Sequence, residues 1–306
     1  MSSSNFSDRL AAVVRRCKCP VVVGLDPRWQ QLPEPLTKGV DPGNRQAMAQ
    51  VYARFCREIV DVVAPLVPAV KPQAAFFEQL GPPGMTALHA IVAYARQKGL
   101  LVIFDGKRND IGSTAEAYAD GFLGEDSAWQ ADALTVSPYL GGDSVQPFVE
   151  IATKRGAGIF VLVKTSNPGG GRFQDLLAEG RPLYRHVAEE VEKLAHATVA
   201  PCGYGAVGAV VGATYPEQLR ELRAAMPHAW LLVPGYGSQG ATARDVAGAF
   251  GAAGLGAVVN NSRGIIFAHA RREYQQFGAA RWQEAVAAAT RDMIDQLCSA
   301  TSAGKL

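Results

Sequence analysis

The feature that most constrains the fold is a regular alternation of short apolar runs with longer helical patterns. Runs such as VVVG and LLVIF are apolar throughout, which is typical of parallel strands with both faces covered. Eight such runs alternating with eight helices favour a closed (β/α)8 TIM barrel, an α/β fold, over an open doubly wound sheet. The predicted strands are Pro20–Asp26, Pro68–Lys71, Leu100–Lys107, Asp132–Val136, Gly158–Lys164, Ala206–Gly212, Ala229–Val233 and Gly256–Asn260.

The helical patterns fill the intervals between these runs. We expect helices near Arg45–Ala64, Met85–Lys98, Ser113–Leu123, Ser144–Arg155, Leu183–His196, Pro216–Met226, Ala241–Phe250 and Ala279–Leu297. The 306 residues are 48% hydrophobic and 19% charged, which is enough apolar material for a large core. No linker divides the chain, so residues 1–306 are predicted to form one barrel domain with a short N-terminal extension and a C-terminal helix.

Charge and cysteine content exclude several classes of protein. The formal net charge is +2 and no window is strongly basic, which argues against a nucleic-acid partner or a membrane-binding patch. The stretch Leu194–Pro216 lacks charged residues, but its glycines and Pro201 indicate loop plus strand, not a membrane span. Five cysteines and an N-terminus without a secretory signal favour a reducing, cytoplasmic location.

No metal site is predicted. Cys17 and Cys19 form a lone C-x-C without a second pair, which is a weak signal for zinc. The histidines show no metal-like spacing with acids, and we expect them to be surface or core residues: His89, His186, His196, His228 and His269.

Charged residues end three consecutive predicted strands. The first ends in Asp26, the second in Lys71, and the third in Asp105 and Lys107, with Asp110 on the loop that follows. The carboxyl ends of barrel strands surround the active site, so two acids and two lysines meet at one rim. Lys107 between carboxylates should stay protonated, which suits it to donate a proton and not to form a Schiff base. The alternative is a set of solvated charges at strand ends.

Two further loops carry candidate binding residues for an anion. The seventh strand runs into the glycine-rich turn 234–240, which includes Gln239, and a helix is expected to follow. Such a turn exposes N–H groups, and the helix dipole favours an anion. The eighth strand runs into residues 260–264, where Arg263 can bind a phosphate through two N–H groups. The alternative is an ordinary turn and a surface arginine.

The end of the fifth strand is a third candidate. The hydroxyl and amide groups of Lys164–Pro168, including Ser166, could bind a polar heterocycle, and helix capping is the alternative explanation. The segment Asn167–Arg181 has three successive glycines and is expected to be a long, mobile connection.

These residues fit a known pattern. The run Ile103–Thr114 contains D-x-K-x-x-D-I-x-x-T and resembles the signature of the orotidine 5′-phosphate decarboxylase family. The resemblance extends along the chain to the motifs GLDPR, KPQAAFFE, SPYLGGDS, KTSNPG, VPGYGSQG and SRGII. This extended set of motifs is similar to that of the longer-chain bacterial subgroup of the family. A related group of phosphosugar aldolases and decarboxylases shares D-x-K-x-x-D, and the D-I-x-x-T continuation separates the two.

The resemblance implies decarboxylation of orotidine monophosphate to UMP, the last step of de novo pyrimidine nucleotide synthesis, with no metal or organic cofactor. It implies that Lys107 protonates C6 of the base and that the partner is a small nucleotide. It also implies a homodimer with a shared active site, in which Asp110 and Thr114 reach the neighbouring subunit. The resemblance implies that Asp105, Asp110 and Lys71 belong to the charged array. It also implies that a second set of residues contacts the substrate: Asp26, Ile111, Thr114, Ser166, Gln239 and Arg263.

Two alternatives remain open at this point. One is a Mg²⁺-dependent pentulose- or hexulose-phosphate decarboxylase or aldolase on the same barrel. The other is a barrel that binds a nucleotide without catalysis, although binding alone does not need an array of acids and lysines.

Overall fold

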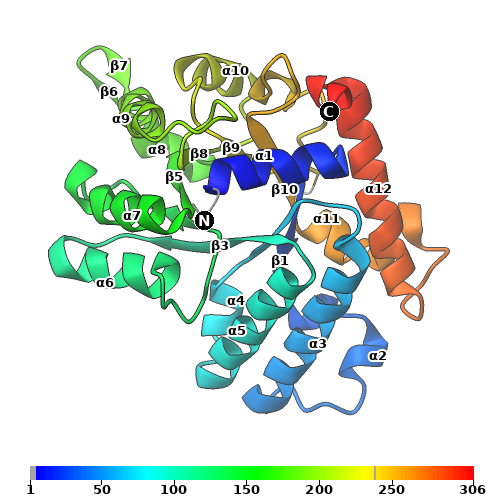
Figure 1. Cartoon of the computed structure of the whole chain (residues 1–306). Coiled ribbons are helices and arrows are strands. Elements are labelled where there is room, and N and C mark those ends of the chain that lie inside the picture. The colour runs from blue at the N-terminus through cyan, green and yellow to red at the C-terminus, as the bar shows by residue number, and fades with distance from the viewer. Residues whose placement is uncertain (1–4, 238) are drawn as a thin grey trace.

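Eight parallel strands close into a barrel. The structure is a computed structural model that describes residues 5–237 and 239–306. In the order β1-β10-β9-β8-β5-β4-β3-β2 each strand pairs with the next and the last returns to the first, which confirms the predicted barrel (Figure 1). The strands are β1 (Val21–Leu25), β2 (Ala69–Pro72), β3 (Leu101–Arg108), β4 (Ala133–Val136), β5 (Gly158–Lys164), β8 (Val207–Val211), β9 (Leu231–Val233) and β10 (Ala257–Asn261).

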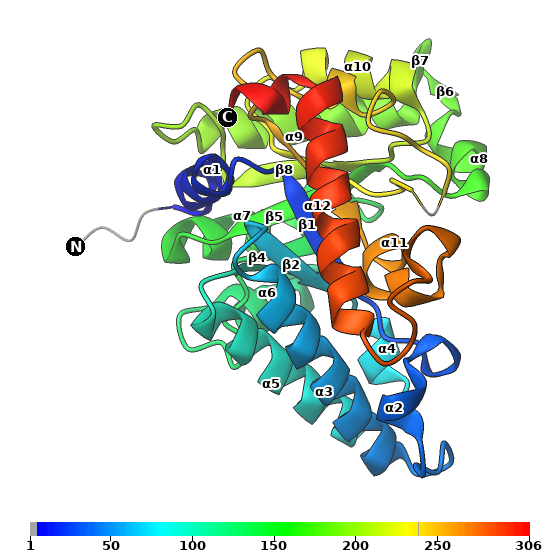
Figure 2. The same cartoon turned by 90° about the vertical axis from the view of Figure 1, so that its right-hand side faces the viewer.

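Long helices surround the barrel and bury its outer face. They are α3 (Arg45–Val63), α5 (Pro82–Gln97), α6 (Gly112–Leu123), α7 (Gly142–Arg155), α9 (Leu183–Ala197), α10 (Pro216–Ala225) and α12 (Trp282–Ala300). Helix α12 packs against α3 and against the short helix α11 (Arg263–Ile266) (Figure 2). Within the described residues, no helix combines the length and the apolar character needed to cross a membrane.

The connection between β9 and β10 differs from the prediction. The helix expected at Ala241–Phe250 is replaced by turns and one 3-10 turn, Ala247–Ala249. Both the backbone N–H and the hydroxyl of Thr242 donate to Asp245 Oδ2 at 2.7 Å. The N–H of Thr242 would have no partner within a helix that begins at Ala241, so this bond does not extend a helix, and Gly248 lowers the helix propensity of the stretch.

The long connection after β5 contains short elements. They are the 3-10 turn Pro168–Gly170, helix α8 (Gly171–Gln174) and the two-stranded hairpin of β6 (Leu177–Ala178) and β7 (Arg181–Pro182). The hairpin lies at the edge of the molecule, next to α9 (Figure 1).

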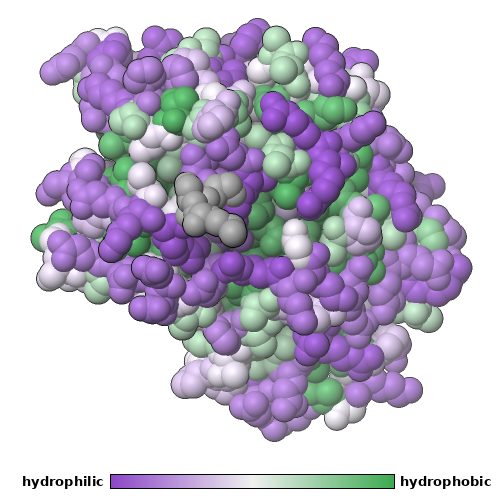
Figure 3. Space-filling model, in the orientation of Figure 1, coloured by the Kyte–Doolittle hydropathy of each residue, from purple (hydrophilic) through white to green (hydrophobic). Residues whose placement is uncertain are grey.

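Helix α1 (Phe6–Cys17) covers the amino-terminal end of the barrel, where the sequence indicated only an extension. The Asn5 side chain caps it by accepting a hydrogen bond from Asp8 N at 2.9 Å. Its apolar face, which includes Phe6 and Leu10, packs on barrel-interior side chains such as Phe160. Its other side belongs to a largely hydrophilic face of the molecule (Figure 3). One barrel end is therefore closed, and the other is left for a binding site.

The packing of α1 leads to a stability prediction. Leu10 is fully buried against the barrel interior, so Leu10→Ala should lower the free energy of unfolding by about 2–5 kcal/mol. Arg16→Ala, on the exposed side of the same helix, should change it by less than about 0.5 kcal/mol. Denaturant unfolding measures both variants. Equal effects would show that α1 does not contribute through its buried face.

Candidate active site

A pocket of about 400 Å³ opens at the carboxyl ends of the strands, opposite α1. It brings together five of the residues singled out from the sequence, namely Lys71, Asp105, Lys107, Ser166 and Gln239. The remaining lining comes from strands β4, β5, β8 and β9 and from the loops after β5 and β9: Thr135, Leu162, Thr165, Asn167, Val210, Leu232 and Pro234.

The alternation of strand side chains explains why polar groups meet here. Strand residues two apart face the same side of a sheet. On β2 the interior residue Ala69 is followed by Lys71, and on β3 the interior residues Leu101 and Ile103 are followed by Asp105. The barrel interior is therefore apolar next to α1 and becomes charged at its open end.

Asp105 is the centre of this charged layer. Its two carboxylate oxygens accept from Lys71 Nζ at 2.5 Å and from Lys107 Nζ at 2.6 Å. The hydroxyl of Thr135 donates to Asp105 Oδ1 at 3.0 Å. Asp105 and Lys71 are only 6% and 5% exposed, so neither charge could be buried there without the other.

The pKa shifts of this pair follow from its surroundings. Burial alone would raise the pKa of Asp105, but the charges of Lys71 and Lys107 outweigh it and hold that pKa well below its usual range. Burial would lower the pKa of Lys71, but Asp105 and Asp26 outweigh it and raise that pKa. Both groups are therefore ionised at neutral pH.

Lys107 has an unusual backbone. Its φ of 46° lies in the left-handed region, which non-glycine residues rarely adopt. The register of β3 against β4 shifts between Phe104 and Arg108, and Lys107 N donates to Thr135 Oγ1 at 2.9 Å within this bulge. The bulge turns the half-exposed Lys107 ammonium over Asp105 at the mouth of the pocket. Backbone strain of this kind concentrates at functional sites.

Thr135 is a site residue that sequence reasoning missed. It is buried on β4 and holds both Asp105 and the Lys107 backbone. The available signal was a single hydroxyl in the otherwise apolar strand ALTV.

Asp26 lies beside this pocket without lining it. Burial raises its pKa, while Lys71 and a hydrogen bond with Ser262 act in the opposite direction. Its Oδ1 is buried and has no hydrogen-bond partner among the described residues. Such an oxygen is suited to accept a hydrogen bond from a ligand hydroxyl.

Asp110, Ile111 and Thr114 lie beyond β3 and do not line the pocket of their own barrel. Asp110 Oδ1 accepts from Ile111 N at 2.9 Å, and Ile111 is 59% exposed. Thr114 is exposed on the first turns of α6. The structure thus separates these residues from the charged layer within one chain.

The loops after β9 and β10 hold the predicted anion-binding residues. Gln239 lines the pocket, and Arg263 begins α11. Gly235 has a φ of 101°, and a Cβ there would lie 3.1 Å from Gln239 Oε1 and 3.3 Å from Ser166 Cβ. The predicted helix dipole after the glycine-rich turn is absent, because turns follow it instead of an α-helix.

Lys164 is not part of the pocket. It is 1% exposed, its ammonium pairs with Asp175, and it lies 4.6 Å from the Tyr215 ring centroid. Gln174 accepts from Thr165 N at 3.0 Å, so α8 is attached to the end of β5 at two points. These contacts fix the segment that carries Ser166.

A closed (β/α)8 barrel with a charged pocket at its carboxyl end has the architecture of a barrel enzyme. The model of the orotidine 5′-phosphate decarboxylase / HUMPS family matches residues 20–277. The chain therefore belongs to this family, and the resemblance drawn from its motifs is confirmed.

Individual relatives agree with this membership. The chain is 58% identical to an orotidine 5′-phosphate decarboxylase of Rhodopirellula baltica, covering 95% of this chain and 98% of the relative. A crystal structure provisionally assigned to the same enzyme in Streptomyces avermitilis has 35% identity and a TM-score of 0.80, over 99% of this chain and 98% of the other. The structure of the orotidine monophosphate decarboxylase of Leishmania donovani has 31% identity to this chain and a TM-score of 0.74, covering 97% of this chain and 98% of the other.

The buried ion pair predicts a pH-dependent stability. Asp105→Asn leaves the Lys71 ammonium buried without its counter-charge, so it should lower the free energy of unfolding by about 3–5 kcal/mol at neutral pH. The pKa of Asp105 is lower in the folded chain than its unfolded value of about 3.9. Its contribution is therefore complete above that value and is lost as the pH falls through the folded value.

Denaturant unfolding of both proteins between neutral pH and about pH 3 measures this effect. The difference between wild type and variant should narrow below about pH 4. Asp126→Asn, an exposed aspartate in a turn, is the matched control and should show little difference at any pH. A difference that stays constant with pH would contradict the assignment.

Proposed function

We propose that the chain decarboxylates orotidine 5′-monophosphate to UMP, with Lys107 as the proton donor and without a metal or organic cofactor. Family membership supports the decarboxylation of this nucleotide in pyrimidine synthesis. The observation that carries the mechanism is the Asp105 carboxylate held between two ammonium groups at the floor of the pocket.

The reaction needs a charged array because the base offers no internal electron sink. When the bond from C6 to the carboxylate breaks, its electron pair stays on C6 and CO2 leaves. The Lys107 ammonium then transfers a proton to C6, and solvent returns a proton to the half-exposed Nζ. Asp105 holds this ammonium in place, and the buried Lys71 keeps Asp105 ionised.

The electrostatic contribution of Lys107 has a definite scale. An ammonium about 4 Å from a developing anion contributes about 4 kcal/mol at an effective dielectric constant near 20. Large enzymatic accelerations require up to about 23 kcal/mol. Binding energy from the remote phosphate must therefore help to close the site and complete the array.

The substrate contacts follow the positions of the remaining residues. Gln239 and Arg263 bind the phosphate from the loops after β9 and β10. Ser166 contacts the pyrimidine from the loop after β5, and the unpartnered Asp26 oxygen accepts from a ribose hydroxyl. Gln239 and Ser166 line the pocket, and Asp26 and Arg263 come from the strand ends beside it, so the proposal requires one nucleotide to extend from the pocket to these two residues.

The proposed enzyme is a homodimer with shared active sites. Asp110 and Thr114 do not line their own pocket and would complete the site of the second subunit, with Ile111 between them. The surface around them carries exposed apolar side chains that a subunit contact would bury: Ile111, Tyr118, Tyr139 and Leu140. In that arrangement Asp110 would lie against the substrate carboxylate and repel it until CO2 departs.

Release of CO2 from orotidine monophosphate, with loss of its ultraviolet absorbance, tests the activity. Lys107→Ala should lower kcat by at least about 10³-fold, because it removes both the proton donor and its charge. Lys38→Ala, at an exposed lysine that does not line the pocket, should leave kcat unchanged. Full activity of Lys107→Ala would refute the proposed donor.

The same assay separates the alternatives. The rate should not change after exhaustive chelation, since the proposed mechanism uses a lysine where a metal would otherwise act. Loss of activity that Mg²⁺ restores would favour the pentulose- or hexulose-phosphate class. Tight binding of UMP without CO2 release would favour a non-catalytic barrel.

Mixing two inactive variants tests the shared site. If Asp110 serves the neighbouring subunit, a dimer of Lys107→Ala and Asp110→Ala chains has one doubly substituted site and one intact site. Random exchange of equal amounts should restore up to about a quarter of the wild-type activity per total site. If Asp110 serves its own pocket, every site keeps one substitution and no activity returns. No recovery despite demonstrated subunit exchange would refute sharing and leave the decarboxylase proposal intact.

A further inference from the structure

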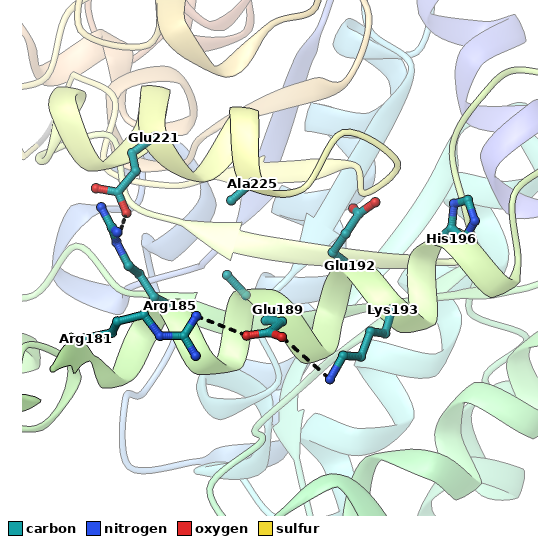
Figure 4. A pocket seen from close by; sticks show the side chains of 9 residues that line it. Arg181, Arg185, Glu189, Glu192, Lys193, His196, Glu221 and Ala225 are labelled. Atoms are coloured by element: carbon teal, nitrogen blue, oxygen red, sulfur yellow. Dashed lines mark hydrogen bonds and ion pairs between the residues drawn. The ribbon is translucent and has the colours of Figure 1, made fainter. Parts of the chain in front are cut away.

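Three side chains with metal-binding atoms meet on the outside of the barrel, away from the decarboxylase pocket. Glu192 and His196 lie one turn apart on α9, facing the side of α10 (Figure 4). His228 lies in the turn between α10 and β9. One donor atom from each of the three residues lies within 4.8 Å of the others.

The cluster is already held together by hydrogen bonds. Glu192 Oε1 lies 2.5 Å from His228 Nδ1, and Glu192 Oε2 accepts from His228 N at 3.2 Å. The rings of His196 and His228 meet edge to face, with centroids 4.7 Å apart. Because a carboxylate accepts hydrogen bonds, His228 Nδ1 carries the proton in this arrangement.

The neighbouring charges leave Glu192 available to a cation. The other acids beside the cluster are paired with basic residues: Glu189 with Arg181 and Lys193, Glu190 with Lys193, and Glu221 with Arg185. Arg223 is near Glu192, but its guanidinium donates to backbone carbonyls, including those of Ala229 and Gly256.

Solvent reaches the cluster through a surface pocket of about 590 Å³, which Glu192 and His196 line. The Glu192 and His228 side chains are 19% and 35% exposed, and His196 is exposed. A hydrated ion therefore has a path to all three donors.

We propose that Glu192, His196 and His228 bind one divalent transition cation of the Zn²⁺ class. Two imidazoles and one carboxylate are a ligand set that Zn²⁺ accepts, with water in the fourth position. Bonds of about 2.0–2.1 Å in a tetrahedron place donors about 3.3 Å apart, so small side-chain rotations complete the site. The metal takes the place of the proton on His228 Nδ1, and that proton moves to Nε2.

The cation would join α9 to the turn before β9. These elements are separate in sequence, since Glu192 and His228 lie 36 residues apart. Binding to the folded chain alone stabilises it by mass action. The site is remote from the charged pocket, so its role is structural and independent of the proposed decarboxylation.

This inference departs from the expectation that the chain has no metal site. The sequence shows only a Glu and a His four residues apart, a spacing that occurs on any polar helix face. The third donor joins them only when α10 packs beside α9.

Isothermal titration of chelator-stripped protein with Zn²⁺, supported by equilibrium dialysis, tests the proposal. Wild type should bind one ion per chain, and its Tm should rise with Zn²⁺ concentration. His196→Ala and Glu192→Gln should each weaken binding by at least about tenfold. His89→Ala removes an exposed histidine elsewhere and is the matched control that should bind like wild type.

Two measurements keep the result decisive. His196 has an exposed side chain, so the His196→Ala variant should fold like wild type, which its Tm without metal verifies. The Co²⁺ adduct should show ligand-field bands without thiolate charge transfer, because none of the three donors is a cysteine. Absence of a stoichiometric site, unchanged binding in His196→Ala, or thiolate bands that place the ion on the cysteines would each overturn the proposal.

Discussion

The contact between Asp105 and Lys71 sets the geometry on which the active end of the barrel depends. Two full charges are buried there, and the solvation that each loses is replaced by the other, by Lys107, by the Thr135 hydroxyl and by the charge of Asp26. The register that places Val70 beside Val102 sets Lys71 level with Ile103, one interior position before Asp105 on β3. A shift of one residue in either strand would turn the charge on that strand toward the helices. The ion pair therefore specifies the alignment of the strands as well as the chemistry.

The barrel divides stability and chemistry between its two ends. At the amino-terminal end, α1 fills the barrel interior with Phe6, Leu10 and Val14. At the carboxyl end the same interior columns carry charged and hydroxyl side chains around an open pocket. The polar layer is tolerated because the apolar layers beneath it supply the packing. Changes in the loops can therefore alter ligand contacts without disturbing the core.

The sequence predicted what depends on local patterns. Strand boundaries agree with the structure to within two residues, because runs such as VVVG and LLVIF are long, apolar and flanked by turn residues. The charged residues predicted at the ends of the second and third strands, Lys71, Asp105 and Lys107, line the pocket at the carboxyl end of the barrel. The helix predicted at Ala241–Phe250 was wrong, because the stretch folds into turns after the contact between Thr242 and Asp245 and periodicity does not reveal where a helix stops. Thr135 and the bulge at Lys107 depend on how β3 meets β4, and no local pattern encodes that.

The left-handed backbone at Lys107 also bears on how such a barrel tolerates change. A lysine in this conformation costs about 1–3 kcal/mol relative to a relaxed backbone, and glycine would adopt the same φ without that cost. Folding alone would therefore be served better by glycine here, whereas the proposed proton donation requires the amine of Lys107. Substitutions that raise thermal stability by relieving backbone strain should therefore leave Lys107 unchanged. The residue of the pocket with a left-handed, non-glycine backbone is thus also the one whose side chain the proposed reaction cannot spare.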